Sequence, residues 1–192
     1  MTILPLAYLP SVEYFAHLLC GGCVVDLGEH FVKRSERNRA RILATDGVME
    51  LTVHVCHANR PRQPVRDVRI DYSKRWQHQH WGALVASYKG SPYFDFYAEY
   101  FEPFYRREYG FLADYNAELR VPMPEFSQAY VAAAAGDTDL RPKRRNEGPA
   151  FIAEPYVQVF SDRMPFQPNL SVADLLFAEG PEAVSVLRRC RL

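Results

Sequence analysis

The chain has 192 residues, 48% of them hydrophobic and 24% charged, which is typical of an ordinary globular domain and excludes a disordered chain. Its 23 Lys and Arg balance 23 Asp and Glu, so the zero net charge argues against a dedicated nucleic-acid binder. No apolar run approaches the roughly 20 residues of a membrane span, and the first residues lack the features of a signal peptide. We expect a cytoplasmic protein with a single domain over residues 1–192.

The beginning of the chain predicts two parallel strands around one helix. An apolar stretch over residues 2–9 precedes Ser11, which can cap a helix whose apolar residues recur at helical spacing. Residues 23–27 are typical of a short buried strand. This order predicts a βαβ unit with a crossover connection.

The Asp46-Gly47 pair predicts a β-hairpin between residues 40–45 and 48–55, and residues 68–72 alternate as a further strand. The second half is expected to be mostly helical. Helices are predicted at 74–89, from Ser91-Pro92 onward, at 111–120, at 125–135, after the capping box at 171–174 and near Pro181. The fold class is therefore mixed α/β, with the βαβ unit and the hairpin in one small mixed sheet.

The polar, basic segment 28–41 follows directly from the predicted strand 23–27. Ligands of open α/β sheets bind beyond the carboxyl ends of strands, which is where this segment lies. Its cations suit phosphate or carboxylate oxygens, and Glu29 or His30 can move a proton. The alternative is a charged loop that faces water. Within the segment, Arg34 and Glu36 are given no role.

A second cluster, Trp76-Gln77-His78-Gln79-His80-Trp81, lies on a predicted helix. Trp76 and His80 are four residues apart and share a helix face, so Trp76 can stack on a sugar or base while His80 acts as acid or base. The alternative is a buried aromatic helix with a hydrogen-bonded histidine. His78 and His80 have the wrong spacing to hold a metal from one helix face.

The four cysteines are expected to be reduced thiols. Cys20-Gly21-Gly22-Cys23 has the spacing of a redox or zinc motif, but Cys20 falls at a helix C-terminus, where a thiolate is disfavoured. A zinc site needs two further ligands, for which Cys56 and His57 are the candidates. We expect neither a metal nor a cofactor.

The basic loop 137–148 carries Arg141 and Lys143. Its glycine and proline neighbours suit a mobile lid that closes over an anion. An ordinary surface loop is the alternative.

Segments spread in order over nearly the whole chain resemble the WbqC-like protein family. They are residues 7–15, 29–33, 37–39, 69–71, Trp76 with His80-Trp81, 91–94, 156–160 and 166–181. The departures are Glu36 in place of a frequent aromatic residue, His54 in place of a frequent proline, Pro165 in place of a frequent glycine, and a shortened basic loop. The resemblance implies a role in bacterial O-antigen or other surface-polysaccharide biosynthesis, and it implies no catalytic residue.

Our first hypothesis is an enzyme that acts on a nucleotide-linked or phosphorylated sugar, most simply by group transfer onto that sugar. The expected anion contacts are Lys33, Arg37, Arg39, Arg141 and Lys143. The expected ring-stacking residues are Tyr8, Trp76 and Tyr156, and the expected hydroxyl contacts are Asn38 and Gln158. Glu29, His30 and His80 are the candidate proton carriers, and the choice among them stays open.

Two rival hypotheses remain. The first is a non-catalytic binding or scaffold protein of the same pathway, which fits the missing catalytic signature. The second is a nucleotidyltransferase-like domain, suggested by the strand–loop–helix order, although residues 8–11 lack a paired-histidine motif. Stabilisation by nucleotide sugars, with or without turnover, separates the enzyme from the scaffold.

Overall fold

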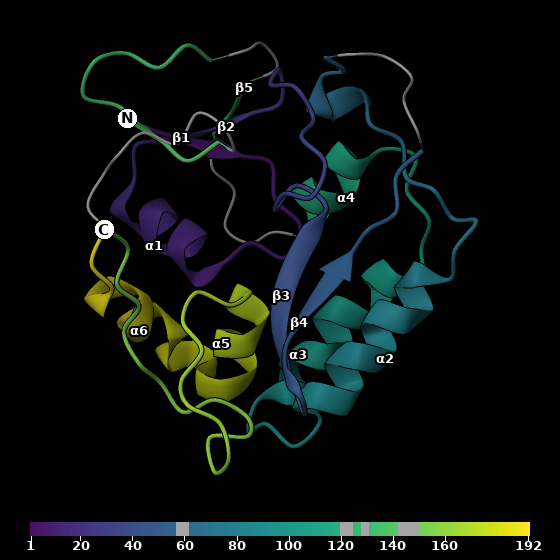
Figure 1. Cartoon of the computed structure of the whole chain (residues 1–192), viewed down its shortest axis with the longest axis vertical. Coiled ribbons are helices and arrows are strands. Elements are labelled where there is room, and N and C mark those ends of the chain that lie inside the picture. The colour runs from purple at the N-terminus through teal and green to yellow at the C-terminus, as the bar shows by residue number, and fades with distance from the viewer. Residues whose placement is uncertain (57–61, 120–124, 128–130, 142–149) are drawn as a thin grey trace.

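The computed structural model describes residues 1–56, 62–119, 125–127, 131–141 and 150–192 (Figure 1). Its described elements combine two small sheets with α-helices, which confirms the mixed α/β class. The strands are β1 (Thr2–Pro5), β2 (Cys23–Asp26), β3 (Arg39–Ala44), β4 (Gly47–Thr52), β5 (Glu125–Ser127) and β6 (Thr138–Asp139). The α-helices are α1 (Val12–Cys20), α2 (Trp76–Tyr88), α3 (Phe94–Phe101), α4 (Leu112–Glu118), α5 (Val172–Glu179) and α6 (Ala183–Arg189), and short 3-10 turns are η1 (Val65–Asp67), η2 (Glu102–Tyr105) and η3 (Gly180–Glu182).

The first sheet is parallel, with strand order β5-β2-β1-β6. In its centre Ile3 and Leu4 of β1 lie beside Val24 and Val25 of β2, and all four are buried. Parallel strands are covered on both faces, which is why they carry continuous apolar runs and not alternating ones. The βαβ unit predicted from the sequence is therefore confirmed.

The helix predicted over residues 125–135 is wrong. Glu125–Ser127 forms strand β5, which pairs with β2, and residues 131–135 are not helical. The alanines of this segment favour a helix by propensity, but the open edge of β2 offers main-chain hydrogen bonds that a short isolated helix does not match. Tertiary pairing has overridden local propensity.

The hairpin of β3 and β4 is present and forms a sheet of its own, whereas the sequence suggested one mixed sheet. Both edges of β1 are already bonded to β2 and β6, so the hairpin has no central edge to join. Its turn pairs Ala44 with Gly47, and Gly47 has a φ of 119°, a conformation that favours glycine.

The described core has two parts, and residues of α5 belong to both. One part packs α1, α5 and α6 against the parallel sheet, through residues such as Leu4, Val25 and Leu187. The other packs the hairpin against α2, α3 and α4, around Trp76 and Phe177. Figure 1 shows α1, α5 and α6 on one side of the hairpin and α2 and α3 on the other.

Two segments contribute to both parts of the core. The loop that follows β1 places Ala7 in the first part and Tyr8 in the second, and α5 does the same with Leu175 and Phe177. These segments also bond to each other, because the Val172 main-chain N–H donates to Pro10 O at 2.8 Å. The seam between the two parts of the core therefore runs along the end of β1.

The strand order of the parallel sheet reverses at β1. The chain moves outward from β1 to β2 and β5, then returns to the other side of β1 as β6. Open parallel sheets bind ligands beyond the carboxyl ends of the strands at such a reversal. A ligand-binding site is therefore expected at the carboxyl ends of β1 and β6. Among the described residues, no helix is long and apolar enough to cross a membrane.

Candidate functional site

Two adjoining cavities open beyond the end of β1. The arginine cavity, of about 180 Å³, and the strand-end cavity, of about 250 Å³, share Ser11, Arg34, Ser35 and Glu36 in their walls. We call the two together the switch-point groove. Residues 34–36 therefore line both halves of the groove, and we call them the rim.

The strand-end cavity lies at the reversal of strand order. Its wall includes Pro5, the last residue of β1, and Leu140, which follows β6 directly. Glu13 and Tyr14 from the first turn of α1 complete that side. The groove therefore occupies the position at which open parallel sheets bind ligands.

Three arginines and two glutamates line the arginine cavity. Arg39 forms an ion pair with Glu50, and its buried Nε has no hydrogen-bond acceptor among the described residues. Arg41 donates from Nη2 to the main-chain carbonyl of Asn169, another wall residue, at 2.8 Å. Arg34 is exposed and forms no ion pair with another described residue, while Glu36 lies beside it in the rim. This cavity combines guanidinium donors with carboxylate acceptors.

Backbone strain is concentrated in the same walls. Leu9, Arg34 and Asn169 have φ values of 40°, 59° and 55°, and each of the three lines the arginine cavity. A left-handed conformation costs a non-glycine residue about 1–2 kcal/mol. It persists where the surroundings fix it, as the two 3.0 Å hydrogen bonds between Asn169 and Glu13 do here, and such residues gather at binding sites.

Several main-chain N–H groups at the helix starts that border the groove are already bonded. At the start of α1, Val12 donates to Leu170 O and Glu13 donates to Oδ1 of Asn169. At the start of α5, the Ala173 N–H donates to Oγ of Ser171 at 3.2 Å. The guanidinium groups of the cavity walls are therefore the main donors for an anion in the groove.

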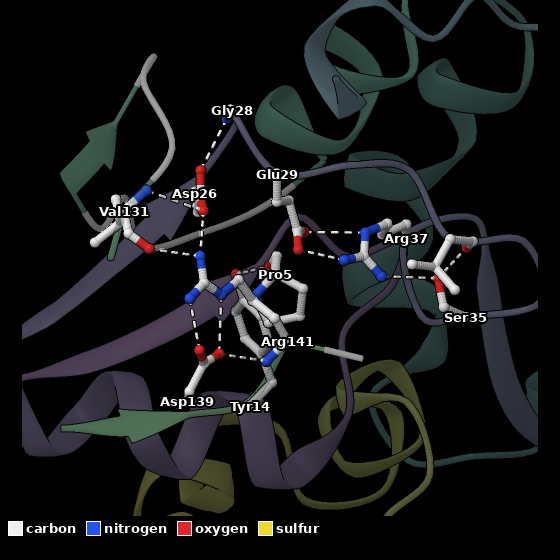
Figure 2. A network of polar contacts seen from close by, with 11 residues as sticks. Pro5, Tyr14, Asp26, Gly28, Glu29, Ser35, Arg37, Val131, Asp139 and Arg141 are labelled. Atoms are coloured by element: carbon white, nitrogen blue, oxygen red, sulfur yellow. Dashed lines mark hydrogen bonds and ion pairs between the residues drawn. The ribbon is translucent and has the colours of Figure 1, made fainter. Parts of the chain in front are cut away.

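A buried ion pair supports the rim from behind. Arg37 donates to both carboxylate oxygens of Glu29, from Nε at 2.9 Å and from Nη2, and both side chains are buried (Figure 2). Its Nη1 donates to Oγ of Ser35 at 3.1 Å, and that hydroxyl donates to Val32 O at 2.6 Å. Burial raises the pKa of Glu29 to about 7, against the lowering effect of the Arg37 charge and hydrogen bonds. The pair positions Ser35, a wall residue of both cavities.

A second buried network joins the carboxyl ends of β2 and β6. Arg141 donates to Asp139 from Nε at 2.9 Å and from Nη2 at 2.5 Å, and its Nη1 donates to Oδ2 of Asp26 at 2.5 Å (Figure 2). Arg141 is 1% exposed and also donates to Val131 O at 2.7 Å. Its charge therefore lies against two carboxylates at the sheet edge. Lys143 lies outside the described residues.

The aromatic cluster lies directly behind the arginine cavity. Tyr8 borders that cavity with a buried side chain, and its hydroxyl bonds to Nδ1 of His80 at 2.9 Å and to the Tyr105 hydroxyl at 3.0 Å. Trp76 is fully buried and packs its ring on His80 and Tyr115, so it presents no open face to a ligand. Burial lowers the pKa of His80 to about 4, which keeps the ring neutral.

Tyr156 and Gln158 bond to a buried carboxylate instead of lining the groove. Asp174 of α5 accepts from the Tyr156 hydroxyl at 2.5 Å, the Tyr88 hydroxyl at 2.8 Å and Nε2 of Gln158 at 3.0 Å. Burial raises the pKa of Asp174. Because its side chain makes these bonds, Asp174 does not complete the predicted capping box, and Ser171 alone caps α5.

The residues expected from the sequence thus fall into separate groups. Tyr8 and Arg39 line the groove, Glu29 and Arg37 lie behind its rim, and His80 touches it through Tyr8. Asn38, next to the rim, donates from Nδ2 to Val53 O at 3.0 Å. His30 and Lys33 are exposed and are absent from the walls of both cavities.

Several residues that form the walls are not among the site residues expected from the sequence. These are Ser11, Glu13, Arg34, Glu36, Arg41, Glu50, Asn169 and Ser171. Arg34, Glu36 and Arg41 lie inside the basic segment that was singled out. For Asn169 the signal was weak, since its left-handed backbone is one that asparagine tolerates better than most residues.

Comparison with known proteins agrees with the resemblance noted in the sequence. A model of the WbqC-like protein family matches residues 7–123. An uncharacterized protein of Mycobacterium tuberculosis (strain ATCC 25618 / H37Rv) is 27% identical over 201 aligned residues, which cover 84% of this chain and 85% of that protein. No solved structure matches the chain. Since the family match spans more than half of the sequence, the chain belongs to the WbqC-like protein family.

Proposed function

We propose that the chain is an enzyme of bacterial surface-polysaccharide biosynthesis that binds a nucleotide-linked or phosphorylated sugar in the switch-point groove. The simplest reaction is transfer of a group onto that sugar. The observation that carries the proposal is the coincidence of one groove with the strand-order reversal, three arginines and three strained wall residues. The polysaccharide context rests on the family.

The chemistry of the walls suits both parts of such a ligand. Arg34 and Arg41 are exposed guanidinium groups without a carboxylate partner among the described residues, and paired N–H donors fit phosphate oxygens. The unpartnered Nε of Arg39 adds a further donor in the wall. Glu13 and Glu36 supply acceptors for sugar hydroxyl groups on the strand-end side.

For the proton acceptor of the reaction we propose Glu36. Glu36 lines both halves of the groove, and Glu29 and His80 lie behind its walls, bonded to Arg37 and Tyr8. A general base has to lie within hydrogen-bond reach of the proton that it accepts. In this view the Glu29–Arg37 pair and the Tyr8–His80 pair hold the walls in place.

Thermal-shift screening with nucleotide sugars and sugar phosphates tests the binding step. A ligand that binds the folded chain raises the melting temperature by mass action. Arg34→Ala and Arg41→Ala should each remove most of the shift. Arg188→Ala is the matched control, because Arg188 is exposed on α6 and absent from both cavities. Shifts that survive in Arg34→Ala and Arg41→Ala would contradict the assigned site.

Mass spectrometry of the same mixtures tests the reaction. An enzyme should convert the stabilising ligand in the presence of a suitable donor, and Glu36→Gln should lose turnover while it keeps the thermal shift. Binding without turnover under all donors would favour the non-catalytic scaffold protein instead.

A further inference from the structure

A third cavity adjoins the arginine cavity across the turn that follows β1. This apolar cavity, of about 460 Å³, shares Leu9 and Pro10 with the arginine cavity. Ser11 and Ser171 line the arginine cavity. Val172, which follows Ser171 and begins α5, lines the apolar cavity. The strained turn at Leu9 therefore forms a common wall between a cationic space and a hydrocarbon-like space.

The apolar cavity is open and strongly hydrophobic. Phe96 and Tyr100 of α3 line it and are 62% and 64% exposed, which is unusual for large aromatic side chains. Of the described residues in its wall, Glu118 carries a charge, and that carboxylate accepts from the Tyr109 hydroxyl at 2.9 Å and pairs with Arg107. The cavity thus offers much apolar surface and few polar groups that could bind a polar ligand.

We propose that the ligand of the groove is a phosphate ester with a hydrocarbon chain, whose phosphate binds Arg34 and Arg41 and whose chain lies in the apolar cavity. This inference rests on the proposed function and narrows it, because the phosphorylated sugar then becomes a lipid-linked one. The two cavities adjoin at Leu9 and Pro10, so a single ligand that crosses this turn can place an anionic group in one and a hydrocarbon chain in the other. Each methylene of a ligand that moves from water into an apolar cavity makes the binding free energy more favourable.

Two other occupants fit the walls less well. A nucleobase would stack on the aromatic rings, but its ring nitrogens and carbonyls would find few hydrogen-bond partners in this lining. A second copy of the chain would cover Phe96 and Tyr100 but would leave the adjoining arginines without a role. A hydrocarbon chain attached to an anion uses both cavities at once.

The test is titration calorimetry of the full chain with n-alkyl phosphates from butyl to decyl, kept below their micelle concentrations, beside inorganic phosphate and decanol. The affinity of the alkyl phosphates should rise roughly two- to fourfold for each added methylene. Arg34→Ala should weaken every alkyl phosphate by a similar factor. Phe96→Ala with Tyr100→Ala should flatten the dependence on chain length but leave inorganic phosphate unchanged. Val157→Ala is the control, since Val157 is 72% exposed and absent from the three cavities.

The outcomes separate this inference from the proposed function. If sugar phosphates bind through Arg34 and the alkyl series shows no chain-length dependence, the inference is overturned and the proposed function stands. If the alkyl series behaves as expected but no sugar phosphate or nucleotide sugar binds, the sugar part of the proposed function fails. Sedimentation that shows a dimer broken by the Phe96→Ala/Tyr100→Ala variant, without alkyl phosphate binding, would assign the cavity to a second copy and overturn the inference.

Discussion

At the scale of single residues, charged side chains near the groove serve two purposes. Arg34 and Arg41 are exposed and line a cavity, whereas Arg37 and Arg141 bind carboxylates in the interior. Removing a charge from water costs several kcal/mol unless a partner and further hydrogen bonds compensate for it. The buried arginines can therefore stabilise the loops that carry the exposed ones.

The Glu29–Arg37 pair leads to a stability prediction. Arg37→Met should lower the free energy of unfolding by roughly 3–5 kcal/mol, because it leaves Glu29 buried without its partner. Glu29→Leu combined with Arg37→Met should recover most of this loss. Urea unfolding of the three proteins measures both effects. A loss below about 1 kcal/mol in Arg37→Met would show that the pair does not hold the rim.

His80 leads to a prediction about pH. Burial, with a smaller effect from His54, lowers the pKa of His80 to about 4, so the folded chain keeps this ring neutral. The unfolded chain takes up the proton near pH 6.5. Relative to His80→Gln, the wild-type chain should therefore lose stability as the pH falls from about 6.5 to about 4, by roughly 3 kcal/mol over that window.

Chemical unfolding of both proteins at several pH values checks this difference. Glu29 titrates in both proteins, so its own contribution cancels in the comparison. Parallel pH profiles for wild type and His80→Gln would rule out a depressed pKa at this position.

At the scale of secondary-structure elements, alanine substitutions at two glycines are expected to change the stability of the chain in opposite directions. Gly82 lies exposed inside α2, with nothing within 4 Å of the position that a Cβ would take. Gly180 ends α5 with a φ of 53°, and a Cβ there would lie 2.5 Å from the Tyr93 ring. Gly82→Ala should stabilise the chain by about 0.5–1 kcal/mol, and Gly180→Ala should destabilise it by more than about 1 kcal/mol. Calorimetric melting of the two variants tests the pair, and equal shifts would contradict it.

Elements with strong local signals were predictable from the sequence. The βαβ unit, the β3–β4 hairpin and α2 follow from apolar periodicity and turn residues, all of which act locally. Strand β5 was not predictable, because its partner β2 lies about a hundred residues earlier in the chain. The alanines after it favour a helix, and only long-range pairing decides against one.

At the scale of the whole molecule, the switch-point groove forms where the two parts of the core meet. Distant segments converge there, since residues 8–11, 34–41 and 169–171 build one cavity. The sequence predicted that the basic segment, with Arg39 in it, and Tyr8 belong to a ligand site. It did not reveal that Arg37 and Arg141 are paired in the interior, because their partners Glu29 and Asp26 are fixed by packing and not by spacing.

The order of the strands explains why this convergence can carry function. The reversal at β1 leaves an opening at the carboxyl edge, and the loops after β1 and β2 form its walls. Leu9, Arg34 and Asn169 lie in those walls in left-handed conformations, which persist where the surrounding structure fixes them. A polar opening of this kind suits a ligand with both phosphate and hydroxyl groups.

The most direct measurement is a crystal structure of the chain with the nucleotide sugar or sugar phosphate that gives the largest thermal shift. We predict a phosphate within hydrogen-bond distance of the Arg34 and Arg41 guanidinium groups, with the sugar toward Glu36 and the end of β1. A ligand bound elsewhere, with the switch-point groove empty, would contradict it.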